Sequence, residues 1–335
     1  MSNNHELETK NKRKCAVCFL TRTPHEEIIR FAKEIGEQQS TIDVYIMIDD
    51  NTYQPPEGYN NYFQFVRIDN AECCSHGYKM SSHLVLQKEC MSWDKSIYFF
   101  CMKKIEYDFV WLVEDDTFIP SVQALVSLND QASSGQYDLV CQKNDHNPNG
   151  RLDTWAHWHD AQGKFQLPWY HSMVCAIGVS RRLLNEISKY AKYRGFLPFI
   201  EYMFNTIAMQ ANLRVHNPPE LSTIIWRQDW PYEQIQARPM NWYHPIKDFN
   251  LQRAHRQKLI GREVPIANNN NTEYQQYQPV YYPYGQQQPQ YPYSMPPQPT
   301  YPTYPAYPTY PIYPGEPTHN TISAIVPSAP PPYPH

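Results

Sequence analysis

Apolar and polar positions form alternating blocks along the first half of the chain, and these blocks predict strands and helices in turn. Short apolar runs that end in polar residues predict strands, at residues 15–24, 42–50, 62–69 and 109–120. Apolar residues at helical spacing predict one helix after the first strand and another over residues 92–104. This β-α-β-β-α-β order is typical of an open α/β sheet, where ligands bind beyond the carboxyl ends of the strands.

The second half of the chain has a less regular pattern. Strands are predicted at residues 137–144 and 169–180, and the later one leads into a helix whose apolar side chains from Leu183 to Tyr190 share a face. A further helix is predicted to begin near Phe199. We therefore expect one large α/β domain.

The first helix carries local start and stop signals. Thr23 is predicted as its N-cap, Pro24 as its first residue and Glu26 as the partner that closes a capping box. Gly36 is predicted to end it.

Three acids, Glu114, Asp115 and Asp116, follow the apolar run that begins at Phe109. Buried carboxylates are costly unless they share a cation or find other partners. On a strand, Glu114 and Asp116 project to one side and Asp115 to the other. Such a cluster suits Mg²⁺ or Mn²⁺ with positions left open for phosphate oxygens, and the alternative is an acid cluster that caps a turn.

A second pair of acids, Asp49 and Asp50, ends the second strand. These side chains are predicted to bind a base or a ribose, or else to stabilise a turn. Thr21 and Arg22 lie at the end of the first strand, so we expect them beside the same site.

Cysteine usage favours reduced thiols. Eight cysteines are present, and Cys15 and Cys18 form a C-x-x-C pair. Residues three apart on a strand face opposite sides, and there is no second C-x-x-C to complete a zinc site. Buried, unpaired thiols are therefore expected rather than a zinc or redox site.

Composition and charge narrow the class of protein. The formal net charge is −4, with basic residues scattered, which argues against nucleic-acid binding. No apolar run is long enough for a membrane span, and the polar first residues lack a signal-peptide core. We expect a cytoplasmic protein. From Pro265 to His335 there is no Lys or Arg, and Pro, Tyr and Gln dominate, which predicts disorder.

Seven short stretches, in this order, resemble the GT-A-type glycosyltransferases, the nucleotide-diphospho-sugar transferase superfamily, over residues 14–253: "AVCFLTRTP", "DVYIMIDD", "SWDKSIYFF", "VWLVEDDTFIP", "CAIGVSRRLL", "FIEYMFNTIA" and "YHPIKD". Each stretch is short, so their order carries the resemblance. The resemblance implies a single GT-A-like domain, Rossmann-like with a mixed central sheet, over residues 14–260. A flexible N-terminus (1–13) precedes it and a disordered tail (261–335) follows.

The resemblance also implies a metal site and a donor site. Asp116 would bind Mn²⁺ or Mg²⁺ and His244 would be a second ligand, with His216 as the competing histidine. The donor, a UDP-sugar or GDP-sugar, would contact Thr21, Arg22, Asp49, Asp50, Lys95, Glu114, Asp115 and Lys247.

Glu201 resembles the family's catalytic base. An inverting transferase needs a carboxylate to take the proton of the acceptor hydroxyl, whereas a retaining enzyme would not need Glu201 in this role. A helix N-terminus lowers the basicity of this carboxylate, and burial beside Phe199, Ile200 and Tyr202 opposes that effect.

Trp155, His157, Trp158 and His159 form an aromatic, histidine-rich segment that Asp160 follows. Its spacing matches zinc sites poorly. It is interpreted as a loop that binds the sugar of the acceptor, or as an aromatic corner of the core.

The tail contains a possible second function. Pro330, Pro331, Pro332 and Tyr333 form a P-P-x-Y motif of the kind that WW domains bind, and an overlapping P-S-A-P sequence resembles motifs that recruit membrane-budding machinery. A plain solubilising tail is the alternative.

The predicted function is metal-dependent transfer of a sugar, with inversion, from a nucleotide-sugar to an unknown hydroxyl acceptor. One alternative is a degenerate transferase domain that acts as an adaptor through its tail. The other is a phosphoryl-transfer enzyme with the same acids, which the lack of a P-loop or a kinase-type glycine-rich loop disfavours. The sequence shows no secretory anchor, in which it departs from Golgi-resident relatives. This suggests cytosolic acceptors or a microbial or viral source. If the source is viral, we expect the protein in the host cytoplasm or the virion.

Overall fold

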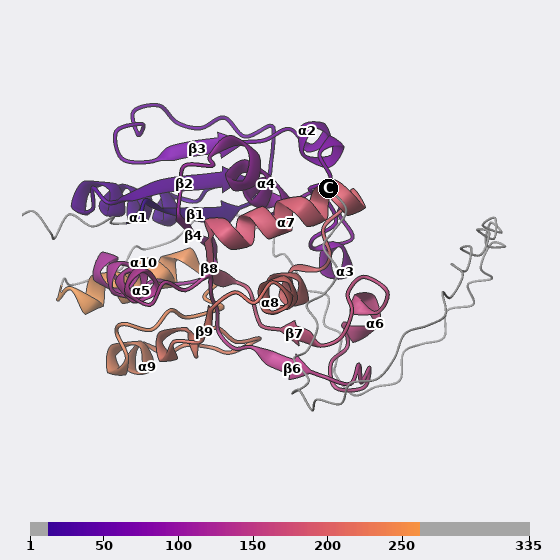
Figure 1. The fold of residues 1–335 in the computed structure, drawn as a ribbon. Helices are drawn as coiled ribbons and strands as arrows, with labels where there is room; N and C mark the ends of the chain where they lie inside the picture. Colours follow the sequence, from indigo (N-terminus) through magenta and orange to yellow (C-terminus); the bar gives the residue numbers. More distant parts are fainter. Residues whose placement is uncertain (1–12, 262–335) are drawn as a thin grey trace, which may run out of the picture. The chain divides into compact units, whose positions relative to one another are not determined.

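The computed structural model describes residues 13–261, and within them seven strands form a mixed central sheet in the order β3-β2-β1-β4-β8-β5-β9 (Figure 1). The strands of this sheet are β1 (Cys15–Thr21), β2 (Ile42–Ile48), β3 (Gln64–Arg67), β4 (Phe109–Glu114), β5 (Leu139–Val140), β8 (Ala176–Ser180) and β9 (Val215–His216). Strands β3, β2, β1 and β4 are parallel, and β8 pairs with β4 antiparallel. A two-stranded sheet joins β6 (Asp145–Asn147) to β7 (Trp169–His171). The predicted α/β class with a mixed central sheet is confirmed.

The helices and helical turns connect these strands. They are α1 (Glu26–Gln38), α2 (Asn70–Ser75), α3 (His83–Leu86), α4 (Ser92–Tyr98), the π-helical η1 (Phe99–Lys103), α5 (Val122–Ser134), α6 (Trp158–Ala161), α7 (Arg181–Arg194), α8 (Ile200–Gln210), the 3-10 turn η2 (Pro219–Leu221), α9 (Tyr232–Ala237) and α10 (Phe249–Leu259). No helix within residues 13–261 combines the length and the apolar character that a membrane span requires.

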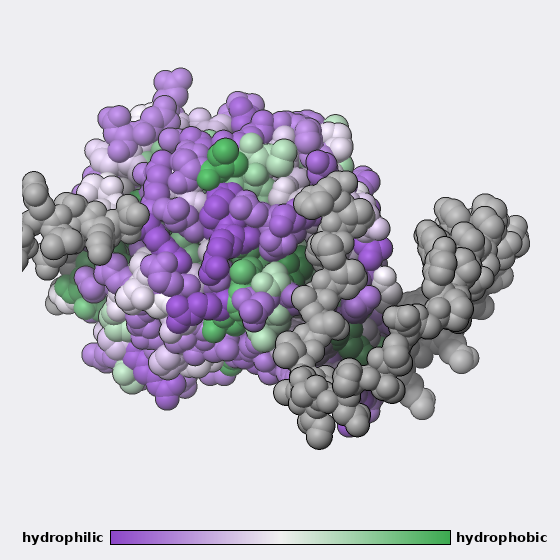
Figure 2. Space-filling view, viewed as in Figure 1, coloured by the Kyte–Doolittle hydropathy of each residue, from purple (hydrophilic) through white to green (hydrophobic). Residues whose placement is uncertain are grey.

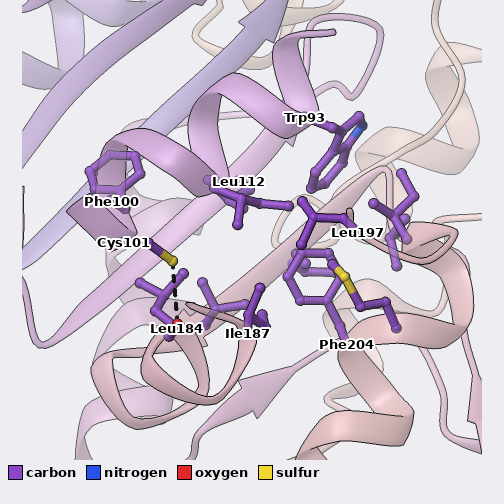
Figure 3. Packing of buried hydrophobic residues seen from close by; sticks show 14 of the residues in the cluster. Trp93, Phe100, Cys101, Leu112, Leu184, Ile187, Leu197 and Phe204 are labelled. Carbon is purple, nitrogen blue, oxygen red and sulfur yellow. Dashed lines mark hydrogen bonds between the residues drawn. The ribbon is translucent and has the colours of Figure 1, made fainter. Parts of the chain in front are cut away.

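Each face of the sheet has its own buried cluster because side chains alternate along a strand. Cys15 and Val17 of β1 pack on the face that α1 and α5 cover, whereas Ala16 and Cys18 pack on the face of α4, α7 and α8. Figure 3 shows part of the cluster on the face of α4, α7 and α8. The two thiols of the C-x-x-C pair therefore face opposite sides, and all eight cysteines, which lie in the described residues, are free.

Helix α1 begins and ends later than its sequence signals predict. The N-cap is His25 rather than Thr23, and its ring nitrogen accepts a hydrogen bond from the Ile28 amide (3.2 Å). The helix continues through Gly36 to Gln38. A Cβ at Gly36 would lie 2.1 Å from the carbonyl oxygen of Tyr62, so this glycine permits a close approach of two backbones and is not a stop signal.

Two predicted elements are divided in the structure. The helix over residues 92–104 changes from α4 to the π-helical η1 at Phe99. The strand over residues 169–180 is split into β7 and β8, because Ser172 between them turns its amide to the Glu201 carbonyl (2.9 Å). Helices α5 and α10 were not predicted at all.

Helix α10 is held against α1 by a buried arginine. Arg256 pairs with Glu27, which lies in α1, and donates to the Ile119 carbonyl (2.8 Å). Its guanidinium also lies 4.0 Å from the ring centroid of Phe31. These contacts fix the C-terminal part of the described chain beside the acid cluster that follows β4.

The face drawn in Figure 2 is largely hydrophilic, with small separate apolar areas. The predicted N-terminal segment up to residue 12 and the predicted tail from residue 262, including Pro330, Pro331, Pro332 and Tyr333, lie outside the described residues.

Candidate active site

The sheet brings the two acid segments to one edge. Strand β1 pairs with β2 on one side and with β4 on the other, so Thr21, Ile48 and Glu114 end at the same level. Asp115 turns toward β1, and the Thr21 hydroxyl donates a hydrogen bond to its carboxylate (2.5 Å). Burial raises the pKa of Asp115 to about 7.

A late segment of the chain places a histidine over the other two acids. Phe118 and Tyr243 form an antiparallel bridge, with N···O distances of 2.8 and 3.0 Å. Next to it, His244 Nε2 lies 3.4 Å from Asp116 Oδ1 and 4.0 Å from Glu114 Oε2. The predicted side chains Asp116 and His244 therefore meet in the structure, and Glu114 shares their side.

The other ring nitrogen of His244 faces the backbone. His244 Nδ1 lies 2.9 Å from the Ile225 carbonyl oxygen, which can only accept a hydrogen bond, so Nδ1 carries the proton. In the neutral ring Nε2 then directs its lone pair to the carboxylates. A carbonyl that fixes the tautomer of a histidine in this way is typical of metal-ligating histidines.

The negative charges of Glu114 and Asp116 make the region around His244 favourable for a positive charge. Burial lowers the pKa of His244, but the carboxylates of Asp116 and Glu114 outweigh burial, and the net shift is upward. Burial raises the pKa of Asp116, yet His244 and Lys247 reverse this and hold it below its usual value. The pKa of Glu114 is raised by burial and by the charge on Asp116. A divalent cation would relieve the same repulsion.

The distances suit a metal ion. Ligand atoms at about 2.1 Å from a six-coordinate ion lie about 3 Å apart on neighbouring positions, close to the separations between His244 and the two acids. One oxygen of each of these carboxylates faces the histidine, and one donor atom each from Glu114, Cys175 and His244 falls within 4.8 Å of the others. Asp116, Glu114 and His244 could hold a dication together.

Two contacts of this cluster were not foreseen. The Trp93 indole donates to Glu114 Oε1 (2.7 Å), which leaves Oε2 to face His244. Cys175, which precedes β8, contributes its thiol. Neither residue is at a recognisable metal-ligand spacing from the acids, so only long-range packing brings them here.

A cleft of about 440 Å³ opens beside the ends of β1 and β2. Among its lining residues are Arg22, Asp49, Asp50, Asn51 and Lys88. Asp49 and Asp50, which were predicted to contact the donor, therefore line the same cleft as the positively charged Arg22 and Lys88. A phosphate or hydroxyl group in it would find donors and acceptors close together.

The predicted donor residues of this region differ in accessibility. Asp50 accepts hydrogen bonds from the Thr52 amide (2.8 Å) and hydroxyl (2.7 Å), which is the turn role that the sequence left open. The Lys95 side chain is fully buried, and Nζ donates to the Asp49 carbonyl (2.6 Å) and to Asn51 Oδ1 (3.0 Å). Lys95 therefore positions the loop after β2 from inside.

Lys247 lies at the open side of the acid cluster. Its Nζ is 3.2 Å from Asp116 Oδ2, and its side chain is 80% exposed. An exposed ammonium on a long side chain can move from a carboxylate to an incoming phosphate at little cost.

Glu201 stands in the first turn of α8, after the N-cap Phe199. Burial and then the charge on Glu114 raise its pKa to about 7. Burial therefore outweighs the effect of the helix N-terminus, and the carboxylate is about half ionised near neutral pH.

The remaining predictions concern aromatic surroundings. His216 lies in β9 and stacks on Tyr137, with ring centroids 4.2 Å apart. In the 155–160 segment, Trp155 stacks on His171 (4.2 Å) and Trp158 is buried. These contacts fit the aromatic-corner interpretation, and the half-buried Trp155 leaves part of its ring to solvent.

No model of a known protein family matches the chain, and no curated protein matches it. Among solved structures, the fold is similar to the mannosyltransferase PcManGT from Pyrobaculum calidifontis in complex with GDP-Man and Mn²⁺, at 12% identity and a TM-score of 0.38. It is also similar to glucosyl-3-phosphoglycerate synthase from Mycobacterium tuberculosis in complex with phosphoglyceric acid, at 12% identity and a TM-score of 0.36.

Each likeness covers 75% of this chain, with 63% of the mannosyltransferase and 81% of the synthase. The chain thus spans less than two thirds of the length of the mannosyltransferase. At such scores the likenesses carry no inference about activity, so the function is argued from the residues of the site.

Proposed function

We propose that this protein is a metal-dependent glycosyltransferase that moves a sugar from a nucleotide-diphosphate sugar to a hydroxyl acceptor. One observation carries the proposal. Glu114, Asp116 and His244 converge at the carboxyl edge of the sheet, where Arg22 and Asp49 line a neighbouring cleft. The resemblance of the ordered sequence motifs supports the same reading.

In this proposal Asp116 and His244 would hold Mn²⁺ or Mg²⁺, with Glu114 beside them. Such an ion would supply positive charge for the diphosphate that leaves. Arg22 and Lys247 add positive charge for phosphate oxygens, and Asp49 accepts hydrogen bonds from the ribose or the base. The donor is a UDP-sugar or a GDP-sugar.

Glu201 is proposed as the general base. Its raised pKa lets it accept a proton near neutral pH from the acceptor hydroxyl that attacks the anomeric carbon. That role belongs to an inverting reaction. The segment around Trp155, which stacks near Phe199 two residues before Glu201, is proposed to bind the acceptor.

The test is release of nucleoside diphosphate from a panel of UDP-sugars and GDP-sugars, with and without Mn²⁺. We expect metal-dependent release that Asp116→Asn lowers at least about 100-fold, because one direct ligand and its charge are lost. Asp153→Asn is the matched control, since Asp153 pairs with Arg151 in an exposed ion pair. Full activity of the Asp116→Asn protein would disprove the assignment of this ligand.

The same assay separates the alternatives. Release of inorganic phosphate without sugar transfer would favour phosphoryl transfer by the same acids. No release of nucleoside diphosphate from any donor, together with no nucleotide-sugar binding in the presence of Mn²⁺, would favour an adaptor. Binding of the tail motif to WW domains remains a prediction from the sequence.

A further inference from the structure

Cys175 lies in the short segment between β7 and β8, directly against the acid cluster. Its carbonyl accepts hydrogen bonds from the Glu114 amide (2.8 Å) and from the Thr117 hydroxyl (3.1 Å). Two bonds from the acid-bearing segment to one carbonyl hold the Cys175 backbone in a fixed position. The side chain has little freedom, because the residue is only 7% exposed.

The thiol of Cys175 faces the same point as the acid and the histidine. Its Sγ lies within 4.8 Å of a donor atom of Glu114 and of Nε2 or Nδ1 of His244. Because Nδ1 is turned to the Ile225 carbonyl, Nε2 is the atom available to share an ion with the sulfur. Asp116 reaches the same Nε2 from 3.4 Å.

Other buried thiols of the chain are engaged elsewhere. Cys101 donates to the Leu184 carbonyl (3.3 Å) within the apolar cluster of Figure 3. Cys141 Sγ is 3.2 Å from the Lys143 carbonyl. A thiol that faces carboxylates and an imidazole nitrogen is in a different chemical setting.

Sulfur changes which ion such a cluster prefers. Oxygen ligands alone suit Mg²⁺ and Mn²⁺, whereas a thiolate with an imidazole favours Zn²⁺ and Co²⁺. Glu114, His244 and Cys175 offer one carboxylate, one imidazole and one thiol, which are ligand types that zinc accepts. Three protein ligands with a fourth position left open are typical of catalytic zinc sites. Mg²⁺ gains little from a sulfur neighbour.

We propose that Cys175 is a ligand of the metal ion at this site and that its sulfur makes the site prefer Zn²⁺ or Co²⁺ over Mg²⁺. On binding, the S–H bond breaks, its proton passes to solvent, and the sulfur donates an electron pair to the ion without any change of oxidation state. The inference rests on the metal site of the proposed function, but not on sugar transfer.

Cobalt provides a direct optical test. The full chain, freed of metal with a chelator, is titrated with Co²⁺ under reducing conditions and its absorption spectrum is recorded. We expect a near-ultraviolet band from thiolate-to-cobalt charge transfer in the natural protein and in Cys101→Ser. Cys175→Ser and Cys175→Ala are expected to lack it.

A second measurement uses the natural protein alone, so it stands even if the Cys175 variants do not fold. During partial unfolding in urea, read by peptide mass spectrometry, Zn²⁺ should protect Cys175 from alkylation by N-ethylmaleimide more than it protects Cys101, which gains only from the added stability of the fold. Mg²⁺ at a concentration that gives the same stability should protect the two thiols equally. Equal protection of Cys175 and Cys101 by Zn²⁺ would overturn the proposal.

A third test compares the affinities of the natural protein and the Cys175→Ser protein for Zn²⁺ and Mg²⁺. Cys175→Ser should weaken Zn²⁺ binding at least about tenfold and leave Mg²⁺ binding within about twofold. Co²⁺ binding by equilibrium dialysis without the charge-transfer band would overturn the role of Cys175 and leave the metal site of the proposed function intact. Sugar transfer that needs no metal, with no Co²⁺ bound, would overturn both the inference and the metal role.

Discussion

At the scale of single residues, the environment changes what a side chain can do. Glu201 and Glu72 are both glutamates in the first turn of a helix. Burial and the charge on Glu114 raise the pKa of Glu201 to about 7, whereas Lys103 and Tyr98 lower the pKa of Glu72. The pKa of the same residue type, in the first turn of a helix in both cases, is thus shifted in opposite directions.

Replacing Glu201 should therefore reveal a pH-dependent stability. A raised folded-state pKa means that the carboxyl contributes most below its unfolded value and that this contribution is lost as pH rises through 7. Relative to the natural protein, Glu201→Gln should gain up to about 3 kcal/mol between pH 4.5 and pH 8. Urea unfolding of the metal-free proteins across this range measures the difference.

Glu72→Gln serves as the control of opposite sign. Its lowered pKa stabilises the folded state above the unfolded value, so this variant should lose stability relative to the natural protein as pH rises. A Glu201→Gln difference that does not change with pH would contradict the raised pKa. It would also remove the support for Glu201 as a base.

At the scale of elements, two contacts fix where the helices lie on the sheet. Gly36 lets α1 approach the loop before β3, and Arg256 ties α10 to α1. Neither contact follows from local propensity. Both depend on a partner far away in the sequence.

Gly36→Ala should destabilise the protein. In an exposed helix this change stabilises by about 1 kcal/mol, but here the new Cβ would meet the Tyr62 backbone oxygen at 2.1 Å. Backbone cannot rotate away as a side chain can, so a loss of about 1–3 kcal/mol is expected in urea unfolding. Gln38→Ala, at the end of the same helix, should change stability by less than about 0.5 kcal/mol. A stabilised Gly36→Ala protein would refute the close approach.

Arg256→Met should destabilise by about 3 kcal/mol, because it leaves Glu27 buried without one of its two arginine partners. Glu27→Gln combined with Arg256→Met should recover part of this loss. The two single variants and the double variant form a thermodynamic cycle by urea unfolding. Strict additivity of the two effects would show that the pair does not interact.

At the scale of the whole molecule, the proposed metal site would link metal binding to folding. Glu114 is the last residue of β4 and Asp116 follows it, whereas His244 lies in the segment before α10. The proposed metal site therefore forms only when these distant parts of the chain are assembled. A ligand that binds the folded state alone raises its stability by mass action.

Mn²⁺ at 100 times its dissociation constant should therefore add about 2.7 kcal/mol to the free energy of unfolding. The rise should appear as a higher melting temperature, disappear with excess EDTA, and be absent in Asp116→Asn. Asp153→Asn should keep it. A shift of equal size in Asp116→Asn would place the ion elsewhere.

The sequence by itself determined the elements whose signals are local. Apolar runs ending in acids marked β2 and β4, and the order of the elements predicted an open α/β sheet with acids at one edge. Strand alternation likewise placed Glu114 and Asp116 together and turned Asp115 away. These features follow from the period of a strand, which depends only on neighbouring residues.

The tertiary structure alone decided the remainder. Packing brings Cys175 and Trp93 to the acids and places His244, rather than His216, beside Asp116. It also buries Lys95 beneath the loop that this side chain positions, and it keeps Gly36 inside a helix. Each outcome depends on contacts between residues far apart in the sequence. Such contacts form only when the sheet and its covering helices pack, and no local pattern of residues encodes them.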